Sequence, residues 1–458
     1  MRTIGIAKLL LASVSAVGAN AIVRGVNLGG WLVTEPWMTP SLFNATATAD
    51  EWHLCNVLGK TECLSTLQNH WSTFYTRDDF VAIKAAGLTS VRIPLGYWAV
   101  DLLDYEPYVS GQYPYLIQAV QWAGELDLTV FMDIHGAPGS QNGWEETGLV
   151  GPVAFSANTS NSDRTLKVLQ NLTTEFSKDQ YGGVVTNIEL LNEPLIGLPQ
   201  LKVFYTAGYN VVGVANTSGI NVTIHDGFYN PHSWAYYDPN NATAAVAADY
   251  LTVDTHQFWA FAPYTDLSKA ELLQQVCAFG QSIRLQQSAS GIPPTLVGEW
   301  SLSTGVTANS TTDAGQDQAK RTWFRQLFEA QNAAFTPNGA GQSSIGWYFW
   351  AWQTEYDIDA WSYRKGVADG YIPSNISDPS TYVFPVLDTG CIDTTFDYTA
   401  PATVTTSATT PSSTASTTAN SSWNATPTSK SAADRTHLDR WEPAGWVAIA
   451  SLAMISLM

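Results

Sequence analysis

The most constraining feature of this 458-residue sequence is a repeated alternation of short apolar runs with stretches of helical period, between residues 22 and 398. The runs that are typical of strands cover residues 23–28, 89–93, 128–135, 185–193, 222–226, 251–256, 295–299 and 345–352. The stretches with helical period cover residues 78–86, 115–126, 164–176, 201–212, 269–287 and 316–331. Strands that alternate with helices in this way favour an α/β fold, a closed (β/α)8 TIM barrel, over an open sheet. Because neither a linker nor a low-complexity segment interrupts residues 22–398, we predict one domain there.

The first 21 residues have the layout of a secretory signal peptide. Arg2 and Lys8 supply positive charge, a short apolar run follows, and Ala19-Asn20-Ala21 forms a cleavage site of the A-x-A type. A membrane-spanning helix is the weaker alternative, because the apolar run is far shorter than the roughly 18 residues that a span needs.

The C-terminal end carries a second targeting pattern. In residues 399–431, 19 of the 33 residues are Ser or Thr, so this segment cannot bury a core and is typical of an extended, glycosylated stalk. Small residues at 431–433, a polar spacer and an apolar tail follow, which predicts that residues 432–458 are a propeptide for GPI attachment. The alternative is a tail-anchored transmembrane helix, which needs about 20 apolar residues.

Cysteines and glycosylation sequons agree with secretion. Four cysteines allow three pairings, and proximity along the chain favours Cys55–Cys63 with Cys277–Cys391. The N-x-S/T sequons are at Asn44, Asn158, Asn171, Asn216, Asn221, Asn241, Asn309, Asn375, Asn420 and Asn424. Their density predicts a glycoprotein.

The charge balance excludes two classes of partner. There are 40 acidic and 21 basic residues, a formal net charge of −19, which disfavours contact with nucleic acid or with anionic lipid through a basic surface. A neutral, polar partner fits better.

Functional side chains fall where the predicted strands end. They are Arg92, His135, Asn192, Glu193, His256, Glu299, Trp350 and Trp352. A barrel builds its active site at the C-terminal ends of its strands, so we expect these side chains to meet. Glu193 and Glu299 are the two carboxyl groups that glycoside hydrolysis requires. The alternative for either one is a structural salt bridge to an arginine at the barrel mouth.

Residues near the strand ends also suggest two further functions, metal binding and stacking on sugar rings. His135 and His256 are not spaced as part of a metal site, and no H-E-x-x-H or Cys–His cluster is present, so we expect no metal and no other cofactor. Aromatic rings near strand ends can stack on sugar rings, although most of the 18 tryptophans are expected in the core.

Five sequence runs carry a family resemblance. They are RGVNLGGWLVTEPW (24–37), VRIPLGYW (91–98), IHGAPGSQNG (134–143), LNEP (191–194) and GEWS (298–301). In this order they closely resemble the fungal exo-β-1,3-glucanases of glycoside hydrolase family 5. The resemblance spans residues 24–391 and implies a (β/α)8 barrel, a retaining double displacement, and release of glucose from the non-reducing ends of β-1,3-glucan.

The resemblance also implies roles for single residues. Glu193 corresponds to the general acid/base and Glu299 to the nucleophile, while Asn192 would bind the sugar 2-hydroxyl and Arg92 would keep the nucleophile ionised. Glu35, His135 and His256 correspond to residues that bond the terminal glucose or the catalytic groups, Trp350 to the floor under that sugar, and Trp144 and Phe261 to an aromatic clamp on the next sugar.

One position departs from the family pattern. The sixth strand of the family usually carries His-x-Tyr, with the Tyr hydroxyl bonded to the nucleophile, whereas this chain has His256-Gln257-Phe258. Loss of that donor predicts a raised pKa of the nucleophile.

Taken together, these patterns predict a secreted, monomeric, GPI-anchored glucan 1,3-β-glucosidase at the cell surface, which acts on wall or extracellular β-glucan and can also transfer glucose to another sugar. The alternatives are a β-1,6-glucanase or another β-glucosidase on the same barrel, and a glucan-binding wall protein that has lost turnover.

Overall fold

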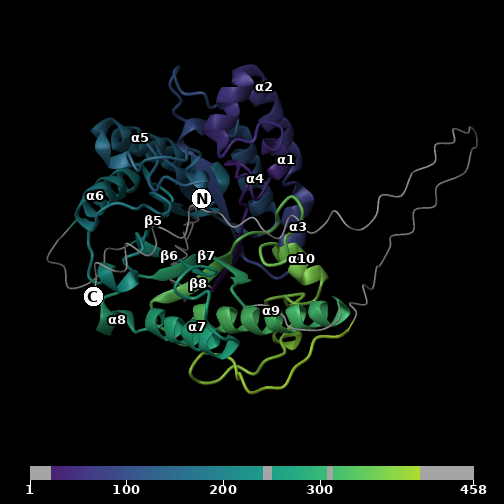
Figure 1. Cartoon of the computed structure of the whole chain (residues 1–458). Helices are drawn as coiled ribbons and strands as arrows, with labels where there is room; N and C mark the ends of the chain where they lie inside the picture. The colour runs from purple at the N-terminus through teal and green to yellow at the C-terminus, as the bar shows by residue number, and fades with distance from the viewer. Residues whose placement is uncertain (1–21, 241–249, 307–312, 403–458) are drawn as a thin grey trace, which may run out of the picture.

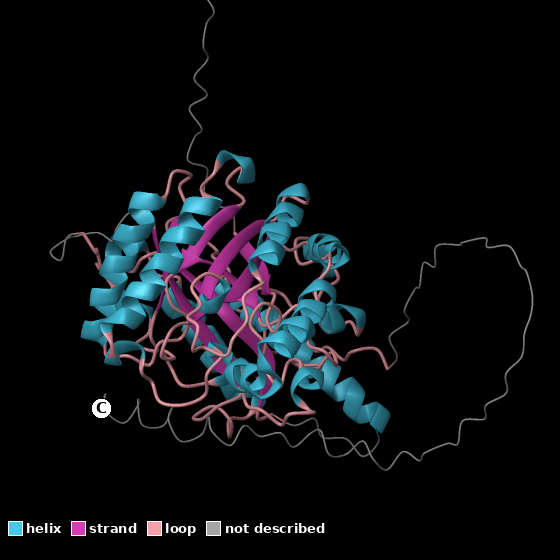
Figure 2. Ribbon diagram, turned by 90° about the horizontal axis from the view of Figure 1, so that it is seen from above, coloured by secondary structure: helices cyan, strands magenta, loops and turns pink. Residues whose placement is uncertain are grey.

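The computed structural model describes residues 22–240, 250–306 and 313–402 and shows a closed barrel of eight parallel strands in sequence order. The strands are β1 Val23–Asn27, β2 Ser90–Gly96, β3 Thr129–Gly136, β4 Val185–Glu189, β5 Asn221–His225, β6 Leu251–Trp259, β7 Thr295–Thr304 and β8 Ser344–Phe349. Viewed from above, the strands lie in the centre and the helices surround them (Figure 2). The predicted (β/α)8 barrel and all eight strand positions are confirmed.

Helices cover the outside of the barrel (Figure 1). They are α1 Pro40–Phe43, α2 Glu51–Thr73, α3 Arg77–Ala85, α4 Tyr113–Glu125, α5 Thr159–Phe176, α6 Leu198–Ala215, α7 Lys269–Ile283, α8 Gln287–Ser290, α9 Asp313–Phe335 and α10 Tyr363–Ala368. The six predicted helical stretches correspond to α3, α4, α5, α6, α7 and α9. None of the described helices is long and apolar enough to cross a lipid bilayer.

All eight strands differ from their predicted bounds by one residue or more, and the differences in β4, β6, β7 and β8 concern site residues. β4 ends at Glu189 and β8 at Phe349, so Asn192, Glu193, Trp350 and Trp352 lie in the segments that follow these strands. Glu193 has φ = 42°, a left-handed conformation that cannot continue a strand. β6 and β7 instead extend past His256 and Glu299, because their pairing continues through register shifts.

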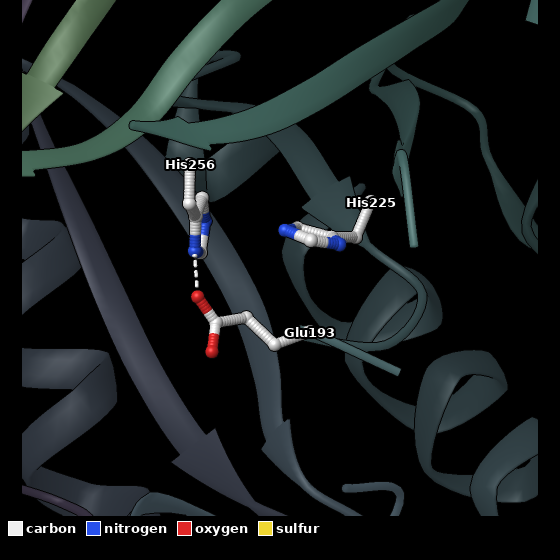
Figure 3. A group of neighbouring side chains, drawn as sticks. All are labelled: Glu193, His225 and His256. Carbon is white, nitrogen blue, oxygen red and sulfur yellow. Dashed lines mark hydrogen bonds and ion pairs between the residues drawn. The ribbon is translucent and has the colours of Figure 1, made fainter. Parts of the chain in front are cut away.

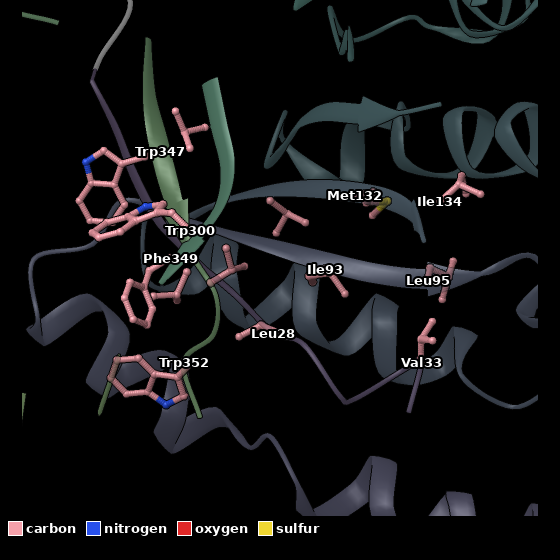
Figure 4. Packing of buried hydrophobic residues seen from close by; sticks show 14 of the residues in the cluster. Leu28, Val33, Ile93, Leu95, Met132, Ile134, Trp300, Trp347, Phe349 and Trp352 are labelled. Carbon is pink, nitrogen blue, oxygen red and sulfur yellow. The ribbon is translucent and has the colours of Figure 1, made fainter. Parts of the chain in front are cut away.

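Alternate residues of each strand point into the barrel and away from it. The outward side chains, such as Ile93 and Met132, pack beneath the helices, where Trp300, Trp347 and Phe349 form an aromatic group (Figure 4). Inside the barrel, Phe131, Leu296 and Tyr348 form a separate apolar cluster. The guanidinium of Arg92 lies 5.4 Å from the centre of the Phe131 ring, so the polar site begins directly above this apolar layer.

Helix α2, which no predicted stretch covered, connects the N-terminal part of the chain to the barrel. The Asp50 side chain caps it by accepting the N–H of His53, and the helix is interrupted at Gly59, whose φ is 74°. Because the interruption breaks the helical period, the sequence of this segment did not predict a helix.

Two disulfides are present, Cys55–Cys63 within α2 and Cys277–Cys391 between α7 and the C-terminal segment. The pairing favoured by chain proximity is confirmed. The predicted signal peptide (1–21), residues 403–431 of the predicted stalk, the predicted GPI propeptide (432–458) and the sequons at Asn241, Asn309, Asn420 and Asn424 lie outside the described residues.

Candidate active site

Arg92 of β2 lies at the centre of the site and contacts residues of several strands. It is fully buried, and its Nη1 donates to Oδ1 of Asn27 at 3.0 Å and to Oε1 of Glu299 at 2.7 Å. Its Nη2 donates to Oε2 of Glu189 and to Oδ1 of Asn192, both at 2.7 Å. Only a side chain that points into the barrel can reach β1, β4 and β7 at once. Arg92 therefore fixes several site residues relative to one another.

Several carboxyl groups surround the single positive charge of Arg92. Asp133 of β3 lies 3.1 Å from Nη2 and Asp254 of β6 lies 3.7 Å from Nε. Burial raises the pKa of Glu189 well above its usual range, Arg92 opposes that shift, and Asp254 and Asp133 add to it. Although burial disfavours the charge of Arg92, these carboxylates raise its pKa well above the usual value, so it remains a cation.

Glu299, the expected nucleophile, is buried in β7 and lies between two cationic groups. Its Oε1 accepts from Arg92, and its Oε2 lies 3.5 Å from Nδ1 of His256. Burial raises the pKa of Glu299 to about 7, His256 and Arg92 oppose the shift, and Glu193 adds to it. Gly298 is required beside it, because its N–H donates to Oδ1 of Asp254 at 2.6 Å and an added Cβ would lie 2.0 Å from the other oxygen.

Glu193, the expected acid/base, follows β4 on a left-handed backbone that a loop holds in place. Its carbonyl accepts from Nδ2 of Asn142 at 3.1 Å. Gln141 donates through Nε2 to the carbonyl oxygens of His135 and Asn192, at 2.7 and 3.0 Å. Gln141 and Asn142 were not predicted as site residues, although both lie within the run IHGAPGSQNG. Their side chains tie the end of β3 to the segment that carries Glu193.

Asn192 keeps one group free for a ligand. Its Oδ1 accepts from Arg92, which leaves the amide Nδ2 as a donor, and within the described residues this buried Nδ2 has no partner. A buried donor without a partner is costly unless a ligand satisfies it. The predicted contact to a sugar hydroxyl fits this geometry.

His135 and Trp350 form a stacked pair beside the expected catalytic carboxyls. The His135 Nδ1 lies 2.6 Å from Oδ2 of Asp133, and because a carboxylate only accepts, Nδ1 carries the proton. The two rings are 5.5 Å apart and nearly parallel, at 9°. Asp133, which also pairs with Arg92, thus orients His135, and His135 stacks on the ring that is expected to form the sugar floor.

Glu35 lies within electrostatic reach of the expected catalytic pair. Its Oε2 accepts from Nε1 of Trp37 at 2.8 Å. Burial and the nearby Glu145 raise the pKa of Glu35 well above its usual range, with smaller contributions from Glu299 and Glu193. Glu145 lies in the loop after β3 and was not predicted as a site residue.

The entrance to the site contains more aromatic rings than the sequence predicted. The Trp144 ring lies 6.1 Å from that of Phe228, and the Phe261 ring lies 6.4 Å from that of Phe258. Phe228, which follows β5 and is 45% exposed, was not predicted. The signal that could have indicated it is its position in the sequence, two residues after the predicted strand 222–226, where strand ends of a barrel carry site residues. The clamp formed by Trp144 and Phe261 remains a prediction.

In the part of the chain that the structure describes, Glu193, His225 and His256 are a group whose ligand atoms lie close enough together to hold a metal ion (Figure 3). One such atom from each residue lies within 4.8 Å of the others. However, the backbone N–H of Gly227 donates to Nδ1 of His225 at 3.0 Å, so the lone pair of the neutral ring is on Nδ1 and the proton is on Nε2. Nε2 of His225 is therefore a donor and not a metal ligand, and the group does not fit a three-ligand site.

The site places two buried carboxyl groups next to one arginine and one histidine, at the mouth of an eight-stranded barrel. This is the arrangement of a barrel glycoside hydrolase. Comparison with known families agrees. The family model described as Cellulase (glycosyl hydrolase family 5) matches residues 55–355, and this chain belongs to that family.

Relatives and solved structures extend the comparison. The chain is 35% identical to a glucan 1,3-beta-glucosidase of Pichia angusta, over 79% of this chain and 88% of that protein. It is 36% identical to a probable glucan 1,3-beta-glucosidase A of Aspergillus fumigatus, over 81% and 91%. The crystal structures of AoRut and of the rutinosidase from Aspergillus niger share the fold, with TM-scores of 0.62 and 0.63, sequence identities of 24% and 22%, 77% of this chain covered, and 97% and 98% of theirs.

Proposed function

We propose that this protein is a retaining, exo-acting glucan 1,3-β-glucosidase, with Glu193 as general acid/base and Glu299 as nucleophile. The observation that carries the proposal is the spacing of the two carboxyl groups. Nδ1 of His256 is 2.5 Å from Oε1 of Glu193 and 3.5 Å from Oε2 of Glu299, so these oxygens are at most about 6 Å apart. Retaining enzymes separate their carboxyl groups by about 5–5.5 Å, whereas inverting enzymes need roughly 6.5–9.5 Å to admit a water molecule.

The proposed reaction proceeds in two steps. In the first, Glu299 attacks the anomeric carbon while Glu193 protonates the departing oxygen, which leaves a glucosyl ester on Glu299. In the second, Glu193 removes a proton from water, and the water oxygen displaces Glu299 from the anomeric carbon. Each step inverts the anomeric centre, so the product keeps the β configuration.

The surrounding residues support this assignment. The free Nδ2 of Asn192 is a donor for the sugar 2-hydroxyl, an interaction that strengthens in the transition state. Trp350, supported by His135, offers an apolar face to the sugar ring, and the carboxyl of Glu35 can bond its hydroxyls. The β-1,3 linkage rests on the relatives, which are named glucan 1,3-beta-glucosidases.

We also infer that the protein is a glycosylated monomer that is secreted and held at the cell surface by a GPI anchor. This inference rests on the sequence of residues 1–21 and 399–458 and on the sequons. It is tested by asking whether a phosphatidylinositol-specific phospholipase releases the protein from intact cells.

The decisive experiment for the activity incubates the purified protein with a linear β-1,3-glucan and, separately, with a β-1,6-glucan, while proton NMR follows the anomeric signals. We expect β-glucose to appear first, from the β-1,3-glucan. Glucose that appears first as the α anomer would exclude retention, and oligosaccharides before glucose would indicate an endo enzyme. Preferential release from the β-1,6-glucan would establish the other linkage, and binding without any product would indicate a glucan-binding protein.

A further inference from the structure

His225, at the end of β5, is a buried side chain beside the catalytic pair that the mechanism above does not use. It is fully buried, and the hydroxyl of Tyr205 donates to its backbone carbonyl at 3.0 Å. The N–H of Gly227 donates to its Nδ1, as described above. Backbone and ring are therefore both held, and the proton of the neutral ring is confined to Nε2.

The protonated edge of His225 faces Glu193 and His256. The rings of His225 and His256 are 4.5 Å apart at 78°, and the ring of Phe228 lies 5.1 Å from His225 on another side. Figure 3 shows one ring nitrogen of His225 directed toward the space between His256 and Glu193, and the other turned back toward its own backbone. The forward nitrogen is Nε2, because Nδ1 is bonded to Gly227. Within the described residues Nε2 is buried and has no hydrogen-bond partner.

The two neighbouring histidines carry different charges. Burial, together with the positive charges of His256 and Arg92, lowers the pKa of His225 well below its usual value, so its ring is neutral. Burial also disfavours the charge of His256, but Glu299, Asp254 and Glu193 raise its pKa well above the usual value. Glu193 is thus next to one charged donor, to which it is already bonded, and one neutral donor that is still unused.

We propose that His225 is a positioning residue whose Nε2–H bonds the Glu193 carboxylate while Glu193 acts as the base of the second step. The inference rests on the proposed function. A ring nitrogen of His225 and a carboxylate oxygen of Glu193 lie within 4.8 Å, so the proposed bond requires the Glu193 side chain to shorten this distance to that of a hydrogen bond, about 3 Å. A donor that faces a carboxylate favours its ionised form, and the ionised form is the one that accepts the proton of water.

The second step is the one that depends on this bond. Water loses a proton to Glu193, its oxygen bonds the anomeric carbon, and the ester bond to Glu299 breaks to return the carboxylate. In the first step Glu193 must instead carry a proton. A substrate whose leaving group needs no proton, 2,4-dinitrophenyl β-glucoside, isolates the second step because its first step is fast.

Other charged groups also act on the two residues. Those facing His225 are His256, Arg92, Asp226 and Glu193. Those facing Glu193 are His256, Glu299, Glu35, Glu145 and Glu146. All of them are retained in the variants below, so differences between variants report on His225.

Two substitutions separate the two ring nitrogens. In His225→Asn the side-chain oxygen can still accept from Gly227, but no donor reaches Glu193. In His225→Gln the amide nitrogen replaces Nε2, while the acceptor for Gly227 is lost. If His225 only fills space, both variants should lose activity in proportion to their loss of thermal stability. If the proposal holds, the glutamine variant should be the more active of the two.

For His225→Asn on the dinitrophenyl glucoside, we expect a kcat about 10-fold or more below that of the parent. The reaction should begin with a burst of one equivalent of dinitrophenol. In the pH profile of kcat, the acid limb should move to higher pH. Azide should restore turnover and yield β-glucosyl azide, because azide attacks the ester without a base. His225→Gln should retain most of the activity. The melting temperature of each variant is measured alongside.

Three results decide the outcome. An asparagine variant with parental kcat and an unmoved acid limb overturns the proposal. A slow asparagine variant that azide does not restore also overturns it, because the defect is then not in the base step. A parent protein that hydrolyses neither the aryl glucoside nor β-1,3-glucan would instead refute the proposed function.

Discussion

Nη1 of Arg92 donates to Oε1 of Glu299 at 2.7 Å in the interior of the barrel. Through its other nitrogen the same guanidinium bonds Asn192, which immediately precedes Glu193. One planar group therefore contacts the expected nucleophile directly and the expected acid/base through its neighbour. A guanidinium offers several donors in a fixed plane, and a lysine ammonium cannot reproduce that geometry.

We therefore expect Arg92→Lys to lower kcat/KM by about 10²-fold or more, which is the usual effect of removing one preorganised donor. Because the Arg92 charge opposes the rise in the pKa of Glu299, its weakening should also move the acid limb of kcat/KM to higher pH. Arg77→Lys, in an exposed pair with Glu125, is the matched control and should leave the profile unchanged. A profile for Arg92→Lys that coincides with the parent would show that Arg92 does not act on the nucleophile.

Glu299→Ala should abolish turnover, because it removes the carboxylate that forms the ester. With an activated aryl glucoside, azide should enter the space left by the carboxyl and give the α-glucosyl azide. Glu193→Ala should instead retain formation of the ester and give the β-glucosyl azide. The configuration of the two products, read by NMR, tests the assignment of each residue. The reverse pattern would exchange their roles.

The sequence predicts the parts of the site that depend on local pattern. The eight apolar runs predict the strands, and a parallel barrel then brings Arg92, His135 and Glu299 to one end. Asp133, Glu189 and Asp254 were not predicted as neighbours of Arg92, since each lies inside an apolar run. Only the register of strands far apart in the sequence places them around one cation.

The contacts made by the loop after β3 could not be predicted from the sequence either. Nothing in the run Gly139-Ser140-Gln141-Asn142-Gly143 indicates that two amide side chains will hold the backbone of residues 192 and 193, because this depends on the path of the loop after β3. The left-handed backbone of Glu193 has the same origin, since tertiary contacts maintain it against the usual preference of a glutamate.

Asn142→Ala should lower kcat by about 10- to 100-fold with little change in KM, because the Glu193 backbone loses a contact that holds a strained conformation and the carboxyl is misplaced. Asn338→Ala, at an exposed position before β8 at the opposite end of the barrel, is the control and should behave as the parent. Equal losses of kcat in the two variants would contradict a specific role for Asn142.

The stability of the protein should decrease on acidification through His70 of α2. Its Nε2 lies 2.8 Å from the carbonyl of Gly30, and burial lowers its pKa to about 4. The unfolded chain binds a proton near pH 6.5, so between that pH and about 4 the unfolded state gains protons that the folded state excludes. From pH 7 to pH 5 this costs about 2 kcal/mol of unfolding free energy.

Urea unfolding of the parent and of His70→Gln at pH 7 and pH 5 measures this contribution. The glutamine can still donate to Gly30 but does not titrate, so its unfolding free energy should fall less on acidification than that of the parent. Equal decreases in the two proteins would show that His70 is not the source.

Phe258→Tyr tests the departure of this chain from its family pattern. Phe258 is partly buried and packs 5.5 Å from the ring of Trp361, in the apolar cluster that contains Trp350. Burial raises the pKa of Glu299, and the resemblance implies that a tyrosine hydroxyl at this position would donate to that carboxylate and oppose the shift. The acid limb of kcat/KM should therefore move to lower pH in the tyrosine variant, while the melting temperature changes little. Phe396→Tyr, at an exposed phenylalanine with no predicted role in the site, is the control. If both variants keep the parental profile, the position of residue 258 does not influence the nucleophile, and burial alone accounts for its raised pKa.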